Sequence, residues 1–274
     1  MSAKQLEQFY TPKETAKFCI DKIKKFINKD TIIIEPSAGK GVFVELLKKY
    51  KIECFDIEPK CDCKKQNFLE FFKSYPKNSI VIGNPPYGKK GKLAIEFINH
   101  SLKMVDIVAF IVPKTLAYSY IAQKNIKGKL IFQTPLPDNS FEFDNKIKKI
   151  PSYFQIWVND IEKFKEYKNL KLLPPKTTHK DLEIKIYNKT TTALKWLNWD
   201  WDIAIKRNSK KGEFILKPQK ATPNTHWILV KAKDKEVLNN LIKIDYSKAN
   251  DEKMTAGMSR SDIIKLYERR GVKG

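Results

Sequence analysis

The residues best suited to chemistry lie in one short stretch, IVIGNPPYGKK at positions 80–90, where a run of β-forming residues stops abruptly. Pro85 and Pro86 lack backbone N–H groups, so the turn presents mainly carbonyl oxygens for hydrogen bonding. Asn84 adds an amide oxygen and Tyr87 adds a flat aromatic face. We therefore identify Asn84, Pro85, Pro86 and Tyr87 as candidate catalytic residues that would hold an amino group attached to a ring.

Such an amino group is a poor nucleophile, because its lone pair is delocalised into the ring. Hydrogen bonds from its N–H groups to Asn84 Oδ1 and to the Pro85 carbonyl would favour an sp³ nitrogen, whose lone pair can attack a methyl group. No general base is required before that attack. The expected reaction is therefore methyl transfer to an exocyclic amine.

A second candidate is the glycine-rich stretch EPSAGKG at positions 35–41, which follows a short apolar run. A glycine-rich turn between a strand and a helix lets backbone N–H groups approach a ligand closely. The stretch differs from the dinucleotide fingerprint and lacks the Gly-Lys-Ser/Thr ending of a phosphate-binding loop. Glu35 would repel a phosphate and would suit a ligand that carries an ammonium or sulfonium group.

Two further stretches could complete a cofactor site. Asp56 ends the next apolar run, 17 residues after Gly39, where doubly wound folds hold a ribose by its hydroxyl groups. Asn67 and Phe68 place an amide beside an aromatic ring and could bracket an adenine. The alternative is that Asp56 is a solvated acid at a strand end and that Phe68 belongs to the core.

The elements that position these residues alternate along the chain. The pattern predicts helices at residues 14–28, 42–50 and 93–105, and strands that begin near residues 31, 52, 79, 106, 130 and 153. Nearly apolar strands that alternate with helices indicate a mostly parallel sheet covered on both faces. We predict an α/β, doubly wound catalytic domain over residues 1–165 and a small α+β domain over residues 166–274, which would recognise the target.

The motifs together resemble a known family. NPPY following EPSAGKG resembles the amino-methyltransferases that use S-adenosylmethionine, and FYTPKETA at positions 9–16 resembles the element before the cofactor loop in N6-adenine DNA methyltransferases. The order of these motifs is similar to the gamma arrangement, in which the target-recognition domain follows the catalytic one. The resemblance covers roughly residues 8–158 and implies a Rossmann-like methyltransferase fold.

The resemblance also implies roles for single residues. Asn84 to Tyr87 would hold the target amine, and a second aromatic residue, Phe141 or else Phe143, would pack the extruded base from its other side. The family usually has aspartate where this chain has Asn67. The residues implied to bind S-adenosylmethionine are Tyr10, Thr11, Pro12, Glu35, Pro36, Ser37, Ala38, Gly39, Asp56, Asn67 and Phe68.

The charge of the chain points to a polyanionic partner. Lysine and arginine exceed acidic residues by a formal charge of +22. We expect double-stranded DNA with a flipped adenine as the substrate, and a cognate restriction endonuclease as a further partner. No signal peptide and no apolar run long enough to span a membrane are present, so a cytoplasmic location is expected. A monomer is also expected. Cys61 and Cys63 lack the second pair of a zinc site, so no metal is expected.

Several alternatives stay open. The same motif and charge would suit a ribosomal-RNA adenine-N6 or guanine-N2 methyltransferase, and protein-glutamine and N4-cytosine methyltransferases share parts of the motif. A non-catalytic DNA-binding subunit on a methyltransferase scaffold is a further alternative.

Some basic and aromatic residues also have two interpretations. Lys89, Lys90 and Lys92 would hold phosphates or form a solvated loop. In the second domain, Trp196, Trp199 and Trp201 with Arg207 would read bases, or the tryptophans would form the core.

Overall fold

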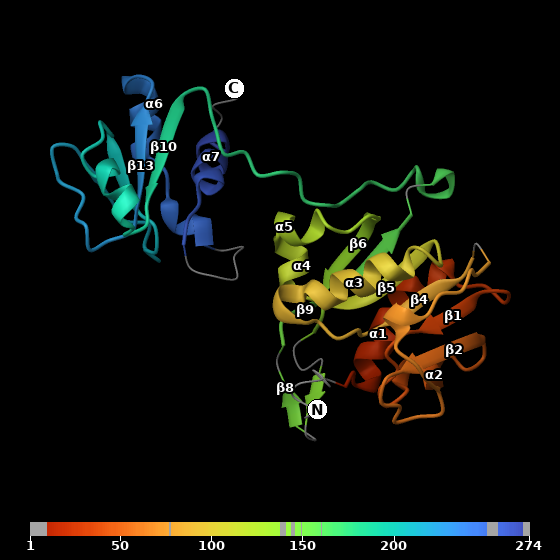
Figure 1. Ribbon diagram of the computed structural model, residues 1–274. Helices are drawn as coiled ribbons and strands as arrows, with labels where there is room; N and C mark the ends of the chain where they lie inside the picture. The colour runs from red at the N-terminus through yellow and green to blue at the C-terminus, as the bar shows by residue number, and fades with distance from the viewer. Residues whose placement is uncertain are drawn as a thin grey trace. The chain divides into compact units, whose positions relative to one another are not determined.

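The computed structural model describes residues 10–76, 78–137, 141–143, 146–148, 150–159, 161–250 and 257–270. The chain divides into two compact units between Leu173 and Pro174 (Figure 1). This division lies beyond the boundary expected after residue 165. The segment that follows residue 165 stays attached to the first unit, because the backbone N–H of Leu172 donates a 2.7 Å hydrogen bond to Gln123 Oε1.

A seven-stranded sheet with the order β3-β2-β1-β4-β5-β9-β6 forms the centre of the first unit. The strands are β1 (Ile32–Glu35), β2 (Lys51–Asp56), β3 (Lys64–Lys65), β4 (Ile80–Gly83), β5 (Ile107–Pro113), β6 (Lys129–Pro135) and β9 (Ser152–Val158). The first five in this spatial order run parallel, whereas β9 is antiparallel to both of its neighbours, β5 and β6. The mostly parallel sheet confirms the predicted doubly wound α/β fold.

Helices cover both faces of this sheet. They are α1 (Lys13–Ile23), α2 (Val42–Leu47), α3 (Lys92–Ser101), α4 (Lys114–Tyr118) and α5 (Tyr120–Gln123). On one face, α1 and α2 pack against side chains such as Ile33 and Ile82. On the other face, which is turned toward the viewer in Figure 1, α3, α4 and α5 pack against Val81 and Val108. Burial on both sides explains why the strands read as continuous apolar runs.

A two-stranded hairpin, β7 (Phe141–Phe143) and β8 (Lys146–Lys148), lies in the chain between β6 and β9. Its first residue, Phe141, belongs to the core that α1 and α2 cover. No helix in the described part of the chain is long and apolar enough to cross a membrane.

The second unit is a small α+β unit. Its strands β10 (Leu182–Tyr187), β11 (Ile203–Lys206), β12 (Phe214–Leu216) and β13 (Trp227–Ala232) form an antiparallel sheet in the order β10-β13-β11-β12. Its helices are α6 (Lys235–Ile242) and α7 (Arg260–Glu268). The helices cover one face of the sheet. The other face is covered by tryptophans, of which Trp201 and Trp227 are buried and Trp196 and Trp199 are half-buried, so core packing accounts for most of this aromatic surface.

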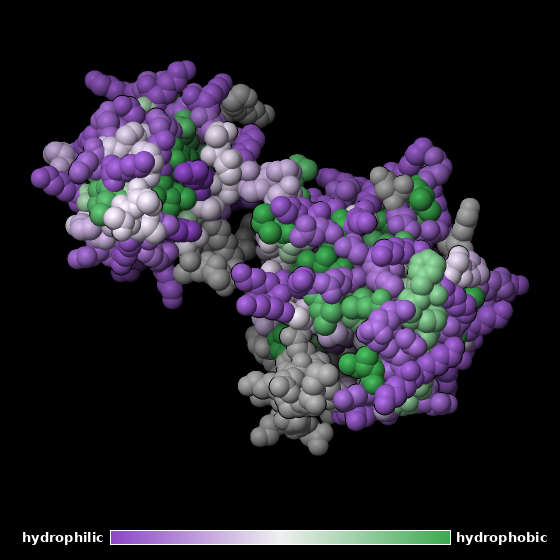
Figure 2. Space-filling view, in the orientation of Figure 1, coloured by the Kyte–Doolittle hydropathy of each residue, from purple (hydrophilic) through white to green (hydrophobic). Residues whose placement is uncertain are grey.

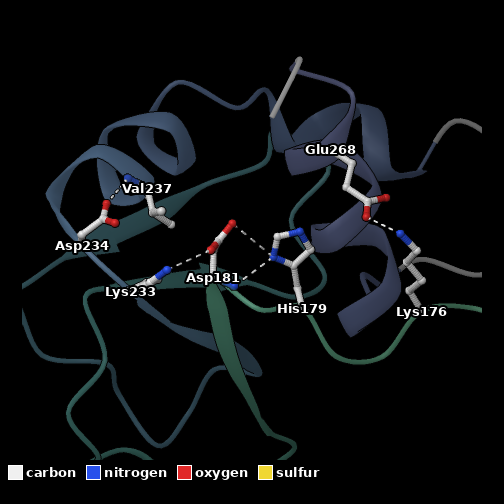
Figure 3. A network of polar contacts seen from close by, with 7 residues as sticks. All are labelled: Lys176, His179, Asp181, Lys233, Asp234, Val237 and Glu268. Carbon is white, nitrogen blue, oxygen red and sulfur yellow. Dashed lines mark hydrogen bonds and ion pairs between the residues drawn. The ribbon is translucent and has the colours of Figure 1, made fainter. Parts of the chain in front are cut away.

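Polar contacts fix the point where the chain enters the second unit (Figure 3). Lys176 Nζ lies 2.6 Å from Glu268 Oε1, which ties the entering chain to the end of α7. The next contact is local, since the backbone N–H of Asp181 donates to Nδ1 of the His179 ring over 3.1 Å. The Asp181 carboxylate lies 3.9 Å from Lys233 Nζ, just beyond β13. The entering segment is thereby held to both a helix and the sheet.

Candidate active site at the carboxyl edge of the first sheet

Three of the strands that precede the predicted site residues are neighbours in the sheet. Strand β1 ends at Glu35 and lies between β2, which ends at Asp56, and β4, which ends at Gly83 just before Asn84. Because these strands are parallel, their carboxyl ends meet at one edge. The structure therefore brings together the glycine-rich loop, the acid at the end of β2 and the Asn-Pro-Pro-Tyr turn.

Glu35 is packed beneath that turn. Its side chain is 1% exposed, and its Oε1 occupies the space where a Cβ on Gly83 would lie. Gly83 is the residue just before Asn84, so only a glycine there leaves room for the carboxyl group. Nothing in the spacing of the motifs predicts this role of Gly83.

The carboxyl group of Glu35 has few polar contacts. Oε1 accepts a long hydrogen bond of 3.4 Å from the backbone N–H of Ser37, while Oε2 is buried and accepts no hydrogen bond from any described residue. Burial raises the pKa of Glu35 well above its ordinary value, and the nearby Asp56 carboxylate raises that pKa further. A buried carboxyl group of this kind favours its neutral form until a cation approaches it.

Asp56 shapes the glycine-rich loop. Its Oδ2 accepts a 2.8 Å hydrogen bond from the backbone N–H of Gly39, and its Oδ1 accepts one of 2.8 Å from the backbone N–H of Glu58. Gly39 has a φ of +52° and Gly41 a φ of +80°, a left-handed conformation that glycine adopts most readily. Each carboxylate oxygen retains further acceptor capacity, so Asp56 could hold the loop and a ligand hydroxyl together.

The Tyr-Thr-Pro segment lies against the same loop. The ring of Tyr10 approaches Gly39 so closely that a Cβ there would lie 3.3 Å from it, and Lys40 Nζ stands 4.6 Å from the centre of that ring. Thr11 is half-buried, and the carbonyl of Pro12 accepts a 3.0 Å hydrogen bond from Ala16 at the start of α1. The segment is thus anchored by the helix while its tyrosine covers the loop.

Asn67 and Phe68 differ in what they can offer a ligand. Asn67 caps a short 3₁₀ helix: its Oδ1 accepts from Leu69 N over 3.2 Å and its Nδ2 donates to Glu70 Oε1 over 2.7 Å. Phe68 is 1% exposed, and its ring stacks on Phe97 with 5.8 Å between centroids. The Phe68 ring therefore lies in the core, the alternative that the sequence left open, and has almost no free face for an adenine.

The Asn-Pro-Pro-Tyr turn is fixed at both ends. The carbonyl oxygen of Asn84 accepts a 3.2 Å hydrogen bond from Ser37 Oγ, which joins the turn to the glycine-rich loop. The Tyr87 carbonyl accepts from Leu93 N over 3.1 Å, and the Tyr87 hydroxyl donates to Ser152 Oγ over 3.0 Å. Ser152 begins β9 and has no counterpart among the motifs read from the sequence. The orientation of Tyr87 thus depends on a strand that is distant in the chain.

Phe141 does not lie where the sequence suggested. It is fully buried and packs edge-to-face against Tyr87, with 6.5 Å between ring centroids and an interplanar angle of 87°. With no exposed surface, Phe141 supports the Tyr87 ring and in this arrangement offers no face to a base. The side chain of Phe143, the other candidate, lies outside the described part of the structure.

Other polar groups border the turn. Lys89 and Lys90 are exposed and form no ion pair with any described residue, whereas Lys92 lies 3.7 Å from Glu96. Cys61 packs against Gly41 of the glycine-rich loop. Among the described residues, no group of histidine, cysteine, aspartate and glutamate has an arrangement that could hold a metal ion.

Comparisons with known proteins relate part of the chain to methyltransferases. The chain is 32% identical over 144 residues to the Type II methyltransferase M.HincII from Haemophilus influenzae, a match that covers 47% of this chain and 28% of the relative. M.HindII from H. influenzae strain Rd matches with the same identity over 47% of this chain and 27% of its own length. The chain thus spans less than a third of the length of these curated relatives. It matches no protein-family model.

Among solved structures, a provisionally named RNA methyltransferase from Pyrococcus horikoshii superposes with a TM-score of 0.47 at 17% sequence identity. This superposition covers 59% of the present chain and 92% of that protein. The homology detected by sequence links part of this chain to Type II methyltransferases.

Proposed function

We propose that this protein is an S-adenosylmethionine-dependent methyltransferase that methylates the N6 amino group of adenine in double-stranded DNA. The observation that carries the proposal is the hydrogen bond from Ser37 Oγ to the carbonyl oxygen of Asn84. It joins a loop suited to a sulfonium cofactor to a turn suited to an aromatic amine. The partial homology to two Type II methyltransferases supports the methyl transfer itself.

The loop residues fit this cofactor. Glu35 offers a buried carboxyl oxygen that accepts no hydrogen bond from the described residues, and such an oxygen suits the ammonium group of the methionine part. Asp56 would accept hydrogen bonds from the ribose hydroxyls. Around them we assign Tyr10, Thr11, Pro12, Pro36, Ser37, Ala38, Gly39 and Asn67 to the cofactor site, with Phe68 contributing its backbone. When bound, S-adenosylmethionine supplies a methyl group on a positively charged sulfur.

The turn would prepare the amine for attack. Asn84 Oδ1 and the Pro85 carbonyl would accept hydrogen bonds from the two N–H groups, which favours a pyramidal nitrogen with an available lone pair. The rigid prolines keep these acceptors in place. Tyr87, held by Ser152, would stack on the base. The nitrogen prepared in this way would accept the methyl group that bound S-adenosylmethionine supplies, and its extra proton would then pass to water.

The substrate assignment rests on charge and homology. The formal charge of +22 favours a nucleic acid, and exposed Lys89 and Lys90 border the turn. An adenine amine within a duplex is inaccessible, so the base would be flipped out of the stack. We propose that the unit formed by residues 174–274 binds the DNA around the target, and that a restriction endonuclease of the same specificity accompanies the enzyme.

The proposal is tested by incubating the purified full chain with S-adenosylmethionine labelled on its methyl group and with unmethylated genomic DNA, total RNA or bulk protein in separate reactions. Nucleosides and amino acids from each reaction are then separated by chromatography. We expect the label in N6-methyladenine from DNA. Label confined to RNA or to glutamine side chains would contradict the DNA assignment, and no transfer to any acceptor would contradict the methyltransferase assignment.

A further inference from the structure

Two tyrosines form a hydrogen-bonded pair close to the candidate active site. Tyr118 ends α4 and is 43% exposed, and Tyr153 lies in β9. Their hydroxyl oxygens are 2.6 Å apart and share one hydrogen bond, while their rings meet edge-to-face with 5.5 Å between centroids. Each ring holds the other in place, so the partly exposed ring of Tyr118 has a fixed orientation.

A lysine stands over the ring of Tyr118. Lys114 Nζ lies 5.5 Å from the centre of the Tyr118 ring, within the range of a cation–π contact. The backbone N–H of Lys114 donates to the carbonyl of Pro151 over 3.0 Å, which fixes the start of α4. Lys114 forms no ion pair with any described residue, so its charge is available to an external anion.

The pair shares strand β9 with a residue that holds the Asn-Pro-Pro-Tyr turn. Ser152, which accepts the hydrogen bond from the Tyr87 hydroxyl, is the residue just before Tyr153. The loop that carries Lys89 and Lys90 also packs on α4, because a Cβ at Gly91 would lie 2.5 Å from Leu116 Cδ1. The loop with two exposed lysines therefore lies beside α4, the helix that carries Lys114 and Tyr118. We call Lys89, Lys90, Lys114, Tyr118 and Tyr153 the tyrosine–lysine surface.

We propose that the tyrosine–lysine surface binds an unstacked nucleotide next to the target base, with the nucleobase on the Tyr118 ring and the backbone phosphates at the lysines. This inference rests on the proposed function and adds a contact that the motifs do not contain. Aromatic rings flanked by cations are the usual means of holding bases that have left the stack. Phe141 is buried and offers no stacking surface. Tyr118 at the end of α4 would supply one instead.

A protein partner is the competing occupant. Hydrophobic side chains reach the surface over α5 (Figure 2), where Ile121 is 61% exposed. Three lysines without ion pairs to described residues make this surface positive, however, and a strand of nucleic acid neutralises them more completely than a mostly apolar protein surface would. Charge complementarity therefore favours the nucleotide.

The test compares Tyr118→Ala, Tyr118→Phe and Lys114→Ala with Tyr50→Ala. The control is matched, because Lys49 Nζ stands 5.0 Å from the Tyr50 ring, and Tyr50 precedes β2 at the opposite edge of the sheet. Binding of a fluorescein-labelled single-stranded DNA of about 20 nucleotides is followed by anisotropy at low salt. We expect Tyr118→Ala and Lys114→Ala to weaken binding several-fold to about tenfold, and Tyr118→Phe and Tyr50→Ala to stay near wild type.

Photocrosslinking of the wild-type chain supplies a measurement that needs no variant. A strand containing 5-iododeoxyuridine should crosslink to Tyr118 or Tyr153, as identified by peptide mass spectrometry. Equal DNA affinity of Tyr118→Ala and Tyr50→Ala, or crosslinks confined to other sites, would overturn this inference even if the wild type methylates DNA. A wild type that neither binds nor methylates nucleic acid would instead overturn the proposed function. Capture of a protein at Ile121 with unchanged DNA affinity in Tyr118→Ala would favour the competing occupant.

Discussion

The hydroxyl group of Ser37 donates a 3.2 Å hydrogen bond to the backbone carbonyl oxygen of Asn84. The two residues follow neighbouring parallel strands, β1 and β4, so this bond joins the two halves of the candidate site. In the proposed reaction one half holds the methyl donor and the other holds the amine. Their separation is then fixed before either ligand binds, which is the geometric condition for direct transfer.

Ser37→Ala should therefore act on turnover more than on binding. A neutral hydrogen bond of this type contributes about 0.5–1.5 kcal/mol, so we expect the turnover number to fall by up to about tenfold. Ser37→Thr, which keeps a hydroxyl, should retain more of the activity. Steady-state methylation at saturating cofactor, together with cofactor affinity from calorimetry, separates the two effects. A loss of affinity as large as the loss of turnover would mean that Ser37 acts only as a cofactor ligand.

Gly83→Ala should destabilise the first unit through Glu35. The new methyl group would overlap Glu35 Oε1, and overpacking of this kind costs about 1–3 kcal/mol in the free energy of unfolding. The double variant Gly83→Ala with Glu35→Ala removes the overlapping atom and should recover most of this loss. Urea unfolding of the wild type, both single variants and the double variant measures the coupling. If the changes in the free energy of unfolding of the two single variants simply add in the double variant, the new methyl group does not overlap Glu35.

Glu35 should make the stability of the protein depend on pH. Because its pKa is raised in the folded protein, the folded state binds more protons than the unfolded state once the pH exceeds the ordinary carboxyl pKa of about 4.3. The free energy of unfolding should therefore decrease as the pH rises above that value. Glu35→Gln mimics the neutral form and should remove this decrease.

The measurement is urea unfolding of wild type and Glu35→Gln at several pH values from 4 to 8. We expect the two proteins to be close in stability at pH 4 and Glu35→Gln to be the more stable at pH 8. In the same variant, cofactor affinity at pH 8 should fall, since a neutral amide cannot balance an ammonium group. A difference in stability that does not change with pH would refute the assignment of a raised pKa to Glu35.

Lys195→Ala should weaken binding of duplex DNA if the second unit contacts the target. Lys195 Nζ stands 4.8 Å from the centre of the half-buried Trp196 ring, and Lys185 Nζ stands 4.9 Å from it. Losing one phosphate contact should lower the slope of log affinity against log salt by about one. The control is Lys243→Ala. Lys243 is exposed and directly follows α6, which covers the opposite face of the second sheet from the tryptophans. Identical salt slopes for both variants would argue against this face as the DNA contact.

Much of the fold follows from local pattern. Strand β5 is a continuous run of apolar residues, so both of its faces must be buried. A parallel sheet covered by helices on both sides meets this requirement. Glu35, Asp56 and Asn84 were expected at strand ends, and the strands that precede them are neighbours. Their meeting at one edge is a consequence of parallel pairing and needs no knowledge of side-chain contacts.

Long-range packing limited the remaining predictions. Phe141 precedes β9 in the sequence, but its ring is buried in the core that α1 and α2 cover, a contact that the local pattern does not reveal. The close approach of Glu35 to Gly83 likewise cannot be predicted from the spacing of residues in the sequence, because β1 and β4 must pair before the two residues meet. The division between the units lies after residue 165 because hydrogen bonds such as that from Leu172 to Gln123 extend the first unit without any change in composition.

The most direct measurement of the central claim is methyl transfer by Asn84→Ala, made alongside calorimetric titration of the same preparation with S-adenosylmethionine. If the turn accepts the hydrogen atoms of the target amine, transfer to adenine should fall by about 100-fold or more, while cofactor affinity stays within about twofold of wild type. Transfer at the wild-type rate, or a loss of transfer explained entirely by lost cofactor binding, would contradict the account.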